Sequence, residues 1–282
     1  MHLQCGRFPL DLGQPVVMGV LNVTPDSFSD GGRFRDVQAA VSHAERMAAD
    51  GAAIIDVGGE STRPGSDPVG EDEELRRVLP VIERLAATLS IPVSVDTRKP
   101  GVMRRAIATG ASLVNDVAAL TAPGAIEAVA GSEVAVCLVH MQGEPGSMQD
   151  APTYVDVVGE VRVFLRSRVA ACVAAGIPRS RIAVDPGFGF GKTLEHNLAL
   201  LAGLPDLAAD GLPVLAGLSR KRMIGVLTGR DGSDRLAGSL AAAVVAVERG
   251  ARIIRAHDVR ETVDALRIVA AAGAMRDNRR NL

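Results

Sequence analysis

The feature of this chain that most constrains its fold is an alternation, repeated eight times, of a short apolar run rich in β-branched residues with a segment of helical periodicity. Helical segments include residues 37–51, which end in glycine, and 71–89, which begin with acidic residues. The apolar runs span residues 16–23, 52–59, 92–96, 111–116, 134–140, 182–186, 213–219 and 251–258. This order predicts an α/β fold, a (β/α)8 TIM barrel, and a doubly wound open sheet is the alternative.

The rest of the chain is consistent with one barrel. Residues 1–13 precede the first barrel strand, and we predict that they form a short N-terminal hairpin covering the bottom of the barrel. No low-complexity segment or linker divides the sequence, and its 282 residues suit an undivided barrel. We therefore predict a single domain over residues 1–282.

Composition excludes several classes of function. The 31 Lys and Arg balance 33 Asp and Glu, and there is no Trp and one Tyr, so neither nucleic acid nor a membrane surface is an expected partner. The N-terminus lacks a signal pattern, and the most apolar helix candidate, 236–250, is too short to span a bilayer. Three distant cysteines (Cys5, Cys137 and Cys172) suit a reduced protein. These features predict a cytoplasmic location.

Polar residues gather at the carboxyl end of every predicted strand, and nothing comparable stands at the amino ends. In a (β/α)8 barrel the carboxyl ends and their loops converge on one mouth, where active sites lie. The sequence therefore predicts a ring of functional groups around this mouth. The ring comprises Asn22, Asp56, Asp96, Asn115 with Asp116, His140, Asp185, Ser219 with Lys221, and Arg255 with His257.

Each member of this ring also has a simpler explanation. An Asp or Asn after a strand often caps a helix or a turn, as Asp116 and Asp258 would. His140 would be a core histidine and Asp56 a structural buried acid. Caps alone would also decorate the amino ends, so the one-sided distribution favours a site.

The stretch IAVDPGFGFGKT (182–193) resembles a phosphate-binding P-loop, but its spacing excludes one. Counting back from Gly191-Lys192, the first glycine of a P-loop would fall on Pro186, which has no N–H to donate. We interpret the stretch as a strand ending in Asp185, followed by a loop that displays Phe188 and Phe190.

The chemistry of the predicted mouth suits a flat heterocycle together with an anion. Asp96 and Asp185 can accept paired N–H bonds from an aminopyrimidine edge, and Asn115 can both donate and accept. Arg255 and His257 alternate on one strand, so they share a face and can hold a phosphate. The five histidines show no metal-binding spacing. The polar loops at 22–32 and 58–66 are either lids over a substrate or solvated surface loops.

Eight motifs in order identify a family resemblance that runs from about residue 16 to 260. The chain resembles the bacterial dihydropteroate synthases of folate synthesis. The resemblance implies a transferase that joins 6-hydroxymethyl-7,8-dihydropterin diphosphate to 4-aminobenzoate, with Mg²⁺, in a homodimer that sulfonamides inhibit. The motifs are NVTPDSFSDGG, IIDVGGESTRPG, SVDT, NDV, HMQG, DPGFGFGK, GLSRK and RAHDV.

The resemblance also implies roles for individual residues. The pterin site would consist of Asp96, Asn115, Asp185, Lys221 and Arg255. The diphosphate site would consist of Asn22, Arg63, Arg255 and His257, with Asn22 also binding the metal. The aminobenzoate site would consist of Phe28, Thr62, Arg63, Pro64, Phe190, Ser219 and Lys221. The catalytic residues would be Asp96, Lys221, Arg255 and His257.

The implied reaction begins with departure of diphosphate, and the amine then captures a pterin-methyl cation, because no residue in the motifs is a convincing base. Asp96 is the candidate for stabilising this cation. The last motif departs from the family pattern with Ala256, which alternation turns away from Arg255 and His257, so we expect only a packing adjustment.

Two other functions compete with this prediction. A methyltetrahydrofolate-dependent methyltransferase would share the pterin-reading acids but has no need of the Ser-Thr-Arg-Pro loop or of a diphosphate-holding Arg-x-His, both of which are present. A non-catalytic pterin-binding paralogue would keep the barrel and lose parts of the loops. Asn22, Thr62, Arg63 and Lys221 are all present, which disfavours the paralogue.

Overall fold

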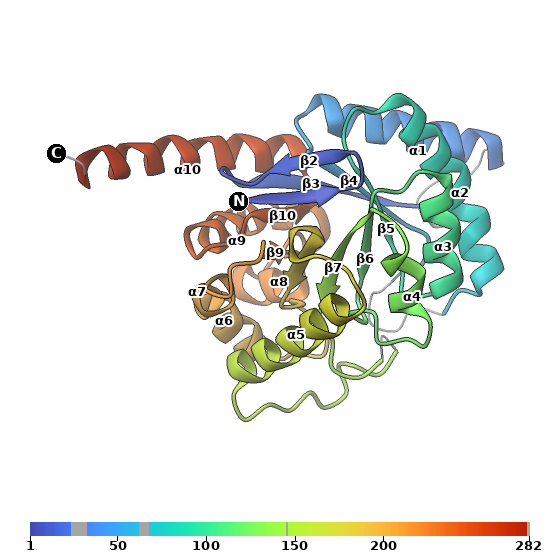
Figure 1. Ribbon diagram of the computed structural model, residues 1–282. Helices are drawn as coiled ribbons and strands as arrows, with labels where there is room; N and C mark the ends of the chain where they lie inside the picture. The colour runs from blue at the N-terminus through green and yellow to red at the C-terminus, as the bar shows by residue number, and fades with distance from the viewer. Residues whose placement is uncertain (24–32, 62–67, 145, 281–282) are drawn as a thin grey trace.

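The computed structural model describes residues 1–23, 33–61, 68–144 and 146–280. In this part of the chain one sheet has eight strands, all pairs parallel, in the order β8-β7-β6-β5-β4-β3-β10-β9, with helices around it (Figure 1). A parallel bridge from Val184 to Val214 joins the two outermost strands and closes the sheet. The predicted (β/α)8 barrel is confirmed, and the doubly wound alternative is wrong. The prediction of a single domain over 1–282 stays a prediction.

Strands and helices alternate around the barrel much as the sequence predicts. The strands are β3 (Val16–Asn22), β4 (Ile54–Gly58), β5 (Val93–Asp96), β6 (Leu113–Asp116), β7 (Ala135–Val139), β8 (Ile182–Asp185), β9 (Leu215–Ala216) and β10 (Ile253–Ala256). The helices are α1 (Arg33–Ala49), α2 (Glu71–Thr88), α3 (Pro100–Thr109), α4 (Ala125–Ala130), α5 (Val157–Ala174), α6 (Leu194–Ala202), α7 (Leu204–Ala208), α8 (Arg222–Thr228), α9 (Leu236–Glu248) and α10 (Val259–Arg280). The strand predicted over 213–219 is shorter than expected, because the chain turns at Leu218, whose carbonyl accepts from the N–H of Lys221.

A hairpin closes the bottom of the barrel, as predicted. Strands β1 (His2–Cys5) and β2 (Phe8–Asp11) pair antiparallel. Leu3, Cys5 and Leu12 are fully buried and pack among the lower side chains of the barrel interior. The N–H of Gly6 donates to the carbonyl of Glu133, just before β7, at 3.0 Å. The bottom is therefore filled with apolar side chains, and the carboxyl end is left for a site.

Alternation along each strand separates two cores. On β10, Ile253 belongs to the barrel interior, while Ile254 and Ala256 pack in the layer between barrel and helices. Successive strand residues face opposite sides, so Arg255 faces inward above Ile253. Ala256 is buried in the outer layer, and the prediction that it faces away from Arg255 is confirmed.

Among the residues that the structure describes, no helix combines the length and the apolar character that crossing a bilayer requires.

Candidate active site

The structure brings most of the predicted site residues together in one pocket at the carboxyl ends of the strands. The floor is apolar and includes Val20, Val117 and Val139. The polar and aromatic lining contains eight of the predicted residues: Asp96, Asn115, Asp185, Phe190, Ser219, Lys221, Arg255 and His257. Strands β5, β6, β8 and β10 and the segments after β8, β9 and β10 supply these side chains, so the prediction of one shared mouth is correct.

Five predicted residues are not in this lining. Phe28, Thr62, Arg63 and Pro64, together with most of the two loops interpreted as lids, lie outside the described residues. Asn22 ends β3 beside the pocket. A Cβ built on Gly58 would lie 3.7 Å from Asn22 Oδ1 and 3.9 Å from Asp96 Oδ2, so these two oxygens lie over the same glycine.

Arg255 is the central charged group of the mouth. Its Nε donates to Asp56 Oδ2 at 2.6 Å and its Nη2 donates to Asp96 Oδ2 at 2.7 Å. Burial alone would lower the pKa of Arg255, but the charges of Asp56 and Asp96 raise it. Burial raises the pKa of Asp96 to about 7, although Arg255 acts in the opposite direction. The guanidinium is therefore held in place by two carboxylates from β4 and β5.

Asp56, which the sequence analysis placed in the ring at the mouth without a specific role, supports this site. It is fully buried on β4, and its Oδ2 also accepts from Asn115 Nδ2 at 3.1 Å. The signal in the sequence is an acid inside an otherwise apolar strand, which is unfavourable unless it is paired. Asn115 Oδ1 has no partner among the described residues, although Asn115 lines the pocket. The amide oxygen is therefore available to a ligand.

Asp185 is fixed by the loop that follows it. Its Oδ1 accepts from the N–H of Gly187 at 2.7 Å. Burial raises the pKa of Asp185 to about 6, and the bond from Gly187 lowers it by a smaller amount. Asp185 lines the pocket, and its second oxygen lies 4.0 Å from a Cβ built on Gly217 of the same lining. One oxygen is thus used for support and the other faces the mouth.

The glycines after Asp185 allow the loop to pass close to the segment after β7. Gly187 and Gly191 have φ of +71° and +62°, which disfavours any side chain. A Cβ at Gly187 would collide with the main-chain oxygen of His140, and one at Gly191 with that of Gln142. The repeated glycines therefore serve tight packing against the backbone, which agrees with the exclusion of a P-loop.

The prediction that this loop displays both Phe188 and Phe190 is wrong for Phe188. Phe188 is 1% exposed and packs in the layer between barrel and helices, and it also contributes to the lining of the pocket. Phe190 remains partly exposed in the pocket, and Lys221 Nζ lies 4.0 Å from the centroid of its ring. The one residue between the two phenylalanines, Gly189, has φ of +78°, and the two rings differ in burial although both contribute to the pocket lining.

Lys192 supports the loop from behind and was not predicted. Its Nζ is 2.9 Å from His140 Nδ1 and donates to the carbonyl of Phe190 at 2.9 Å. Burial lowers the pKa of Lys192 to about 7, and burial beside this lysine lowers the pKa of His140 to about 3. His140 is therefore a neutral core histidine, as the simpler explanation proposed. The only signal for Lys192 was its place at the end of the glycine motif.

Ser219 orients the ring of His257. The hydroxyl accepts from the N–H of His257 at 3.2 Å and lies 3.0 Å from its Nδ1. These two contacts hold the ring of His257 with Nδ1 toward Ser219, so the Nε2 edge of the ring is turned away from the serine. Burial and the charge of Arg255 lower the pKa of Lys221 to about 8. The mouth thus carries three nitrogen donors beside its acids: Lys221, Arg255 and His257.

Other polar strand ends have structural roles. Asp116 accepts from the N–H groups of Ala118 and Leu120 at 2.8 and 2.7 Å, so it caps a turn. Asp258 pairs with Arg220.

Cys137 is 1% exposed inside the barrel, where burial raises its pKa well above the usual range, so it is a small core residue. Within the described ranges, no group of three or more His, Cys, Asp or Glu side chains could hold a metal ion.

Comparisons with known proteins agree with this geometry. The profile of the family described as pterin binding enzyme matches residues 18–257. The chain is 52% identical to the dihydropteroate synthase of Escherichia coli (strain K12), over 96% of each chain. It is similar to a Xanthomonas albilineans dihydropteroate synthase solved with 4-aminobenzoic acid (55% identity, TM-score 0.91, 97% and 98% covered). It is also similar to the Burkholderia cenocepacia enzyme complexed with 7,8-dihydropteroate (50% identity, TM-score 0.90, 98% of both chains covered).

The packing of the glycine loop gives a prediction about stability. Gly187→Ala is expected to lower the free energy of unfolding by at least roughly 2 kcal/mol more than Gly211→Ala. Both glycines have similar backbone angles (φ +71° and +75°), but nothing lies within 4 Å of a Cβ at Gly211. The control should therefore lose only about 1–2 kcal/mol of conformational energy. Urea unfolding measures both, and equal losses would show that the contact with His140 is loose.

Proposed function

The chain belongs to the pterin binding enzyme family, among its bacterial dihydropteroate synthases. From this premise we propose which residues bind each substrate and which take part in the reaction. The enzyme is a transferase that joins a pterin to 4-aminobenzoate and yields 7,8-dihydropteroate. We propose that the pterin arrives as 6-hydroxymethyl-7,8-dihydropterin diphosphate. The observation that carries the assignment of roles is the pocket in which eight predicted residues meet around Arg255.

The acids of the mouth are proposed to read the pterin edge. Asp185 and Asp96 accept N–H bonds from the aminopyrimidine ring, and Asn115 Oδ1 supplies a further acceptor. Lys221 donates to the acceptor side of the ring, and the planar guanidinium of Arg255 stacks on its face. Because Asp56 and Asp96 already fix Arg255, little freedom of this side chain is lost when the ring binds.

The aminobenzoate site is proposed to lie beside the pterin site. Phe190 offers an aromatic wall, and Ser219 and Lys221 offer polar groups for the carboxylate. Sulfonamides resemble aminobenzoate, so they are expected to compete here, with resistance arising at Phe28, Pro64 or Ser219. We assign Thr62, Arg63 and Pro64 to the same site from the family motif alone.

Asn22 fits a magnesium site of the kind that a diphosphate substrate completes. Mg²⁺ prefers oxygen ligands and is often bound by one or two protein groups plus phosphate oxygens and water. Asn22 Oδ1 lies over Gly58 and is a suitable donor, whereas the neighbouring Asp96 Oδ2 already accepts from Arg255. When bound, the ion would neutralise charge on the diphosphate oxygens. Arg63 and His257 would bind the same diphosphate.

The residues favour departure of diphosphate before the amine attacks. We propose that His257, oriented by Ser219, donates a ring N–H to the leaving diphosphate, with Arg255 in the same pocket. We propose no base for the amine among the described lining residues, because Asp96 and Asp185 are assigned to the pterin. Asp96, ionised above its raised pKa, would stabilise the pterin-methyl cation electrostatically. The amine then captures the cation and forms the new C–N bond, and the resulting ammonium loses one proton to the departed diphosphate or to water.

Of the competing functions, relatives at about half identity over nearly the full length exclude the methyltransferase. An activity assay distinguishes a synthase from a non-catalytic pterin-binding paralogue. The protein is incubated with the pterin diphosphate and Mg²⁺, with and without 4-aminobenzoate, while diphosphate and dihydropteroate are measured. We expect one dihydropteroate per diphosphate, and loss of turnover when EDTA removes the metal. Tight pterin binding without product would identify the paralogue.

Substitution of the two acids around Arg255 separates their roles. Asp96→Asn is expected to lower kcat, because the stabilising carboxylate is lost. Asp56→Asn removes one charged hydrogen bond that positions Arg255, so kcat/KM should fall roughly 10- to 100-fold. Asp264→Asn, which alters an exposed ion pair on α10, is the matched control and should leave activity unchanged. If Asp96→Asn weakened only pterin binding, Asp96 would not be the stabilising group.

The raised pKa values predict a pH dependence. Asp185 has a pKa of about 6 and Asp96 of about 7, and both must be ionised to accept N–H bonds from a pterin. Below pH 6 the ionised fraction of Asp185 falls about tenfold per pH unit, so the affinity for 6-hydroxymethylpterin should fall as pH decreases from 7 to 5. Titration calorimetry measures this trend. Asp185→Asn should flatten it near pH 6, and an unchanged slope would contradict the assignment.

We also propose a homodimer in the cytoplasm. Exposed apolar side chains lie on helices that pack against α9: Val226 and Leu227 on α8 and Ile268 on α10, which are 58%, 53% and 73% exposed. Such a surface suits association with a second copy. The three cysteines are free and buried, as suits a reducing compartment. Light scattering of the purified chain tests the dimer directly.

A further inference from the structure

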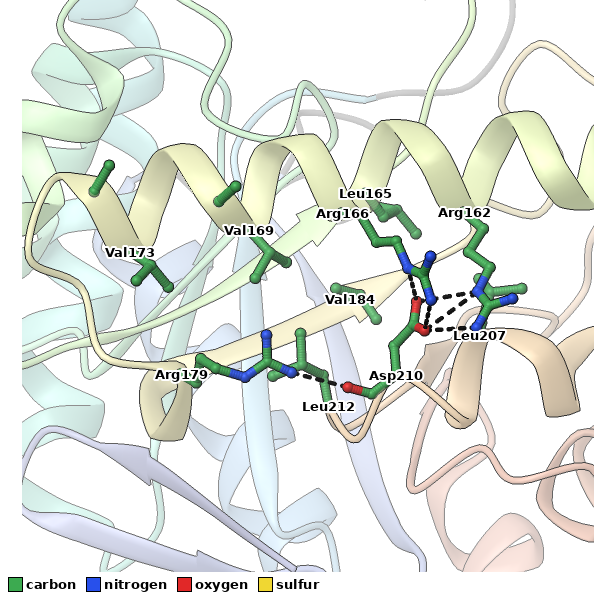
Figure 2. A pocket seen from close by; sticks show the side chains of 12 residues that line it. Arg162, Leu165, Arg166, Val169, Val173, Arg179, Val184, Leu207, Asp210 and Leu212 are labelled. Atoms are coloured by element: carbon green, nitrogen blue, oxygen red, sulfur yellow. Dashed lines mark hydrogen bonds and ion pairs between the residues drawn. The ribbon is translucent and has the colours of Figure 1, made fainter.

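A cavity of about 590 Å³ lies on the outside of the barrel, away from the mouth. One wall is α5, and the opposite wall is formed by the segment from α7 to β9 (Figure 2). Its floor includes Val184, on the outer face of β8. The next residue, Asp185, belongs to the mouth, so the cavity and the mouth use opposite faces of one strand. Binding in the cavity is therefore independent of the proposed function.

The walls of the cavity are apolar side chains. Leu165, Val169 and Val173 follow one another at four-residue spacing on one side of α5, and Leu207 and Leu212 face them. Val173 is 44% exposed, so the wall remains open to solvent at this position. The volume lies within the range of small-molecule sites, roughly 300–1,000 Å³. The cavity is therefore large enough for the apolar body of a small molecule.

One end of the cavity carries an excess of positive charge. Arg162 and Arg166 both pair with the carboxylate of Asp210, at 2.7 and 2.5 Å, and Arg179 donates to its main-chain carbonyl at 2.8 Å. Figure 2 shows these guanidinium groups converging on Asp210. The two arginines lower the pKa of Asp210 to about 2, so it is ionised at neutral pH. Even with Asp206 acting on Arg162, three cations exceed the two nearby acids.

The arginines keep donors available beyond Asp210. Arg162 and Arg166 each use Nε and Nη2 for Asp210, and within the described part of the chain their Nη1 groups donate no hydrogen bond. Guanidinium groups with remaining N–H donors bind carboxylates and phosphates well. The cavity thus combines an apolar channel with an anion-binding end.

We propose that this cavity binds a small amphipathic anion, with an acyl or aryl body along α5 and a carboxylate or phosphate head at Arg162 and Arg166. The body replaces water over Leu165, Val169 and Val173, and the head adds an acceptor where positive charge exceeds negative. Tight binding needs both features of the ligand. A neutral hydrocarbon gives the arginines no acceptor, and an inorganic anion leaves the apolar walls in contact with water.

Octanoate is the test ligand, and octan-1-ol is its uncharged counterpart. Titration calorimetry on the full-length protein is expected to show one octanoate bound per chain, and weaker binding of the alcohol. Arg166→Gln should weaken octanoate about fivefold, since one charge-assisted bond at a partly exposed site is lost. Arg267→Gln, an exposed arginine on α10, is the matched control and should bind octanoate as the wild type does.

A second pair of variants tests the location. Ala170, an exposed residue that lines the cavity, can be replaced by Phe to fill it. Ala170→Phe should abolish octanoate binding and keep dihydropteroate synthesis, whereas Val163→Phe on the exposed side of α5 should change neither. Absence of saturable octanoate binding, as when a second copy covers the cavity, would overturn the proposal. So would binding that Ala170→Phe leaves intact, or equal affinity for octanol.

Discussion

The pairing of Arg255 with Asp56 and Asp96 is the interaction on which the barrel mouth depends. It joins β10 to β4 and β5, strands that are far apart in the sequence, through bonds of 2.6 and 2.7 Å. The side chain of Arg255 is only 19% exposed, so without its carboxylates the guanidinium would carry a poorly compensated charge, which is costly in such surroundings. The fold can keep this charge inside only with both acids in place, so the position of the guanidinium is fixed before any ligand arrives.

The parallel barrel makes this arrangement possible because each strand has two faces with different tasks. On β10, Arg255 faces the mouth while Ile254 and Ala256 pack against the helices. On β8, Asp185 faces the mouth while Val184 packs outward. Hydrophobic packing on the outer face holds the strand, and the inner face is free to carry charges. The hairpin of residues 2–11 fills the opposite end, so charged groups are confined to one opening.

The loop after β8 is positioned by close packing of its backbone. Positive-φ glycines let the loop lie against the chain after β7, and Lys192 and His140 support it from behind. Asp185 receives an N–H bond from Gly187, and Phe190 is held at the pocket edge by the bond from Lys192 to its carbonyl. Precise placement of two pocket residues therefore depends on contacts that lie outside the pocket.

The sequence by itself determined the barrel, the hairpin and the side of the barrel that carries the polar groups, because alternation and strand polarity are local patterns. It also identified eight residues of the pocket from motifs at the strand ends. Only the tertiary structure decided that Asp56 positions Arg255, that Lys192 supports the loop and that Phe188 is buried. These facts depend on contacts between residues such as 56 and 255, which become neighbours only when the sheet closes. Local spacing carries no information about which distant strand supplies a partner.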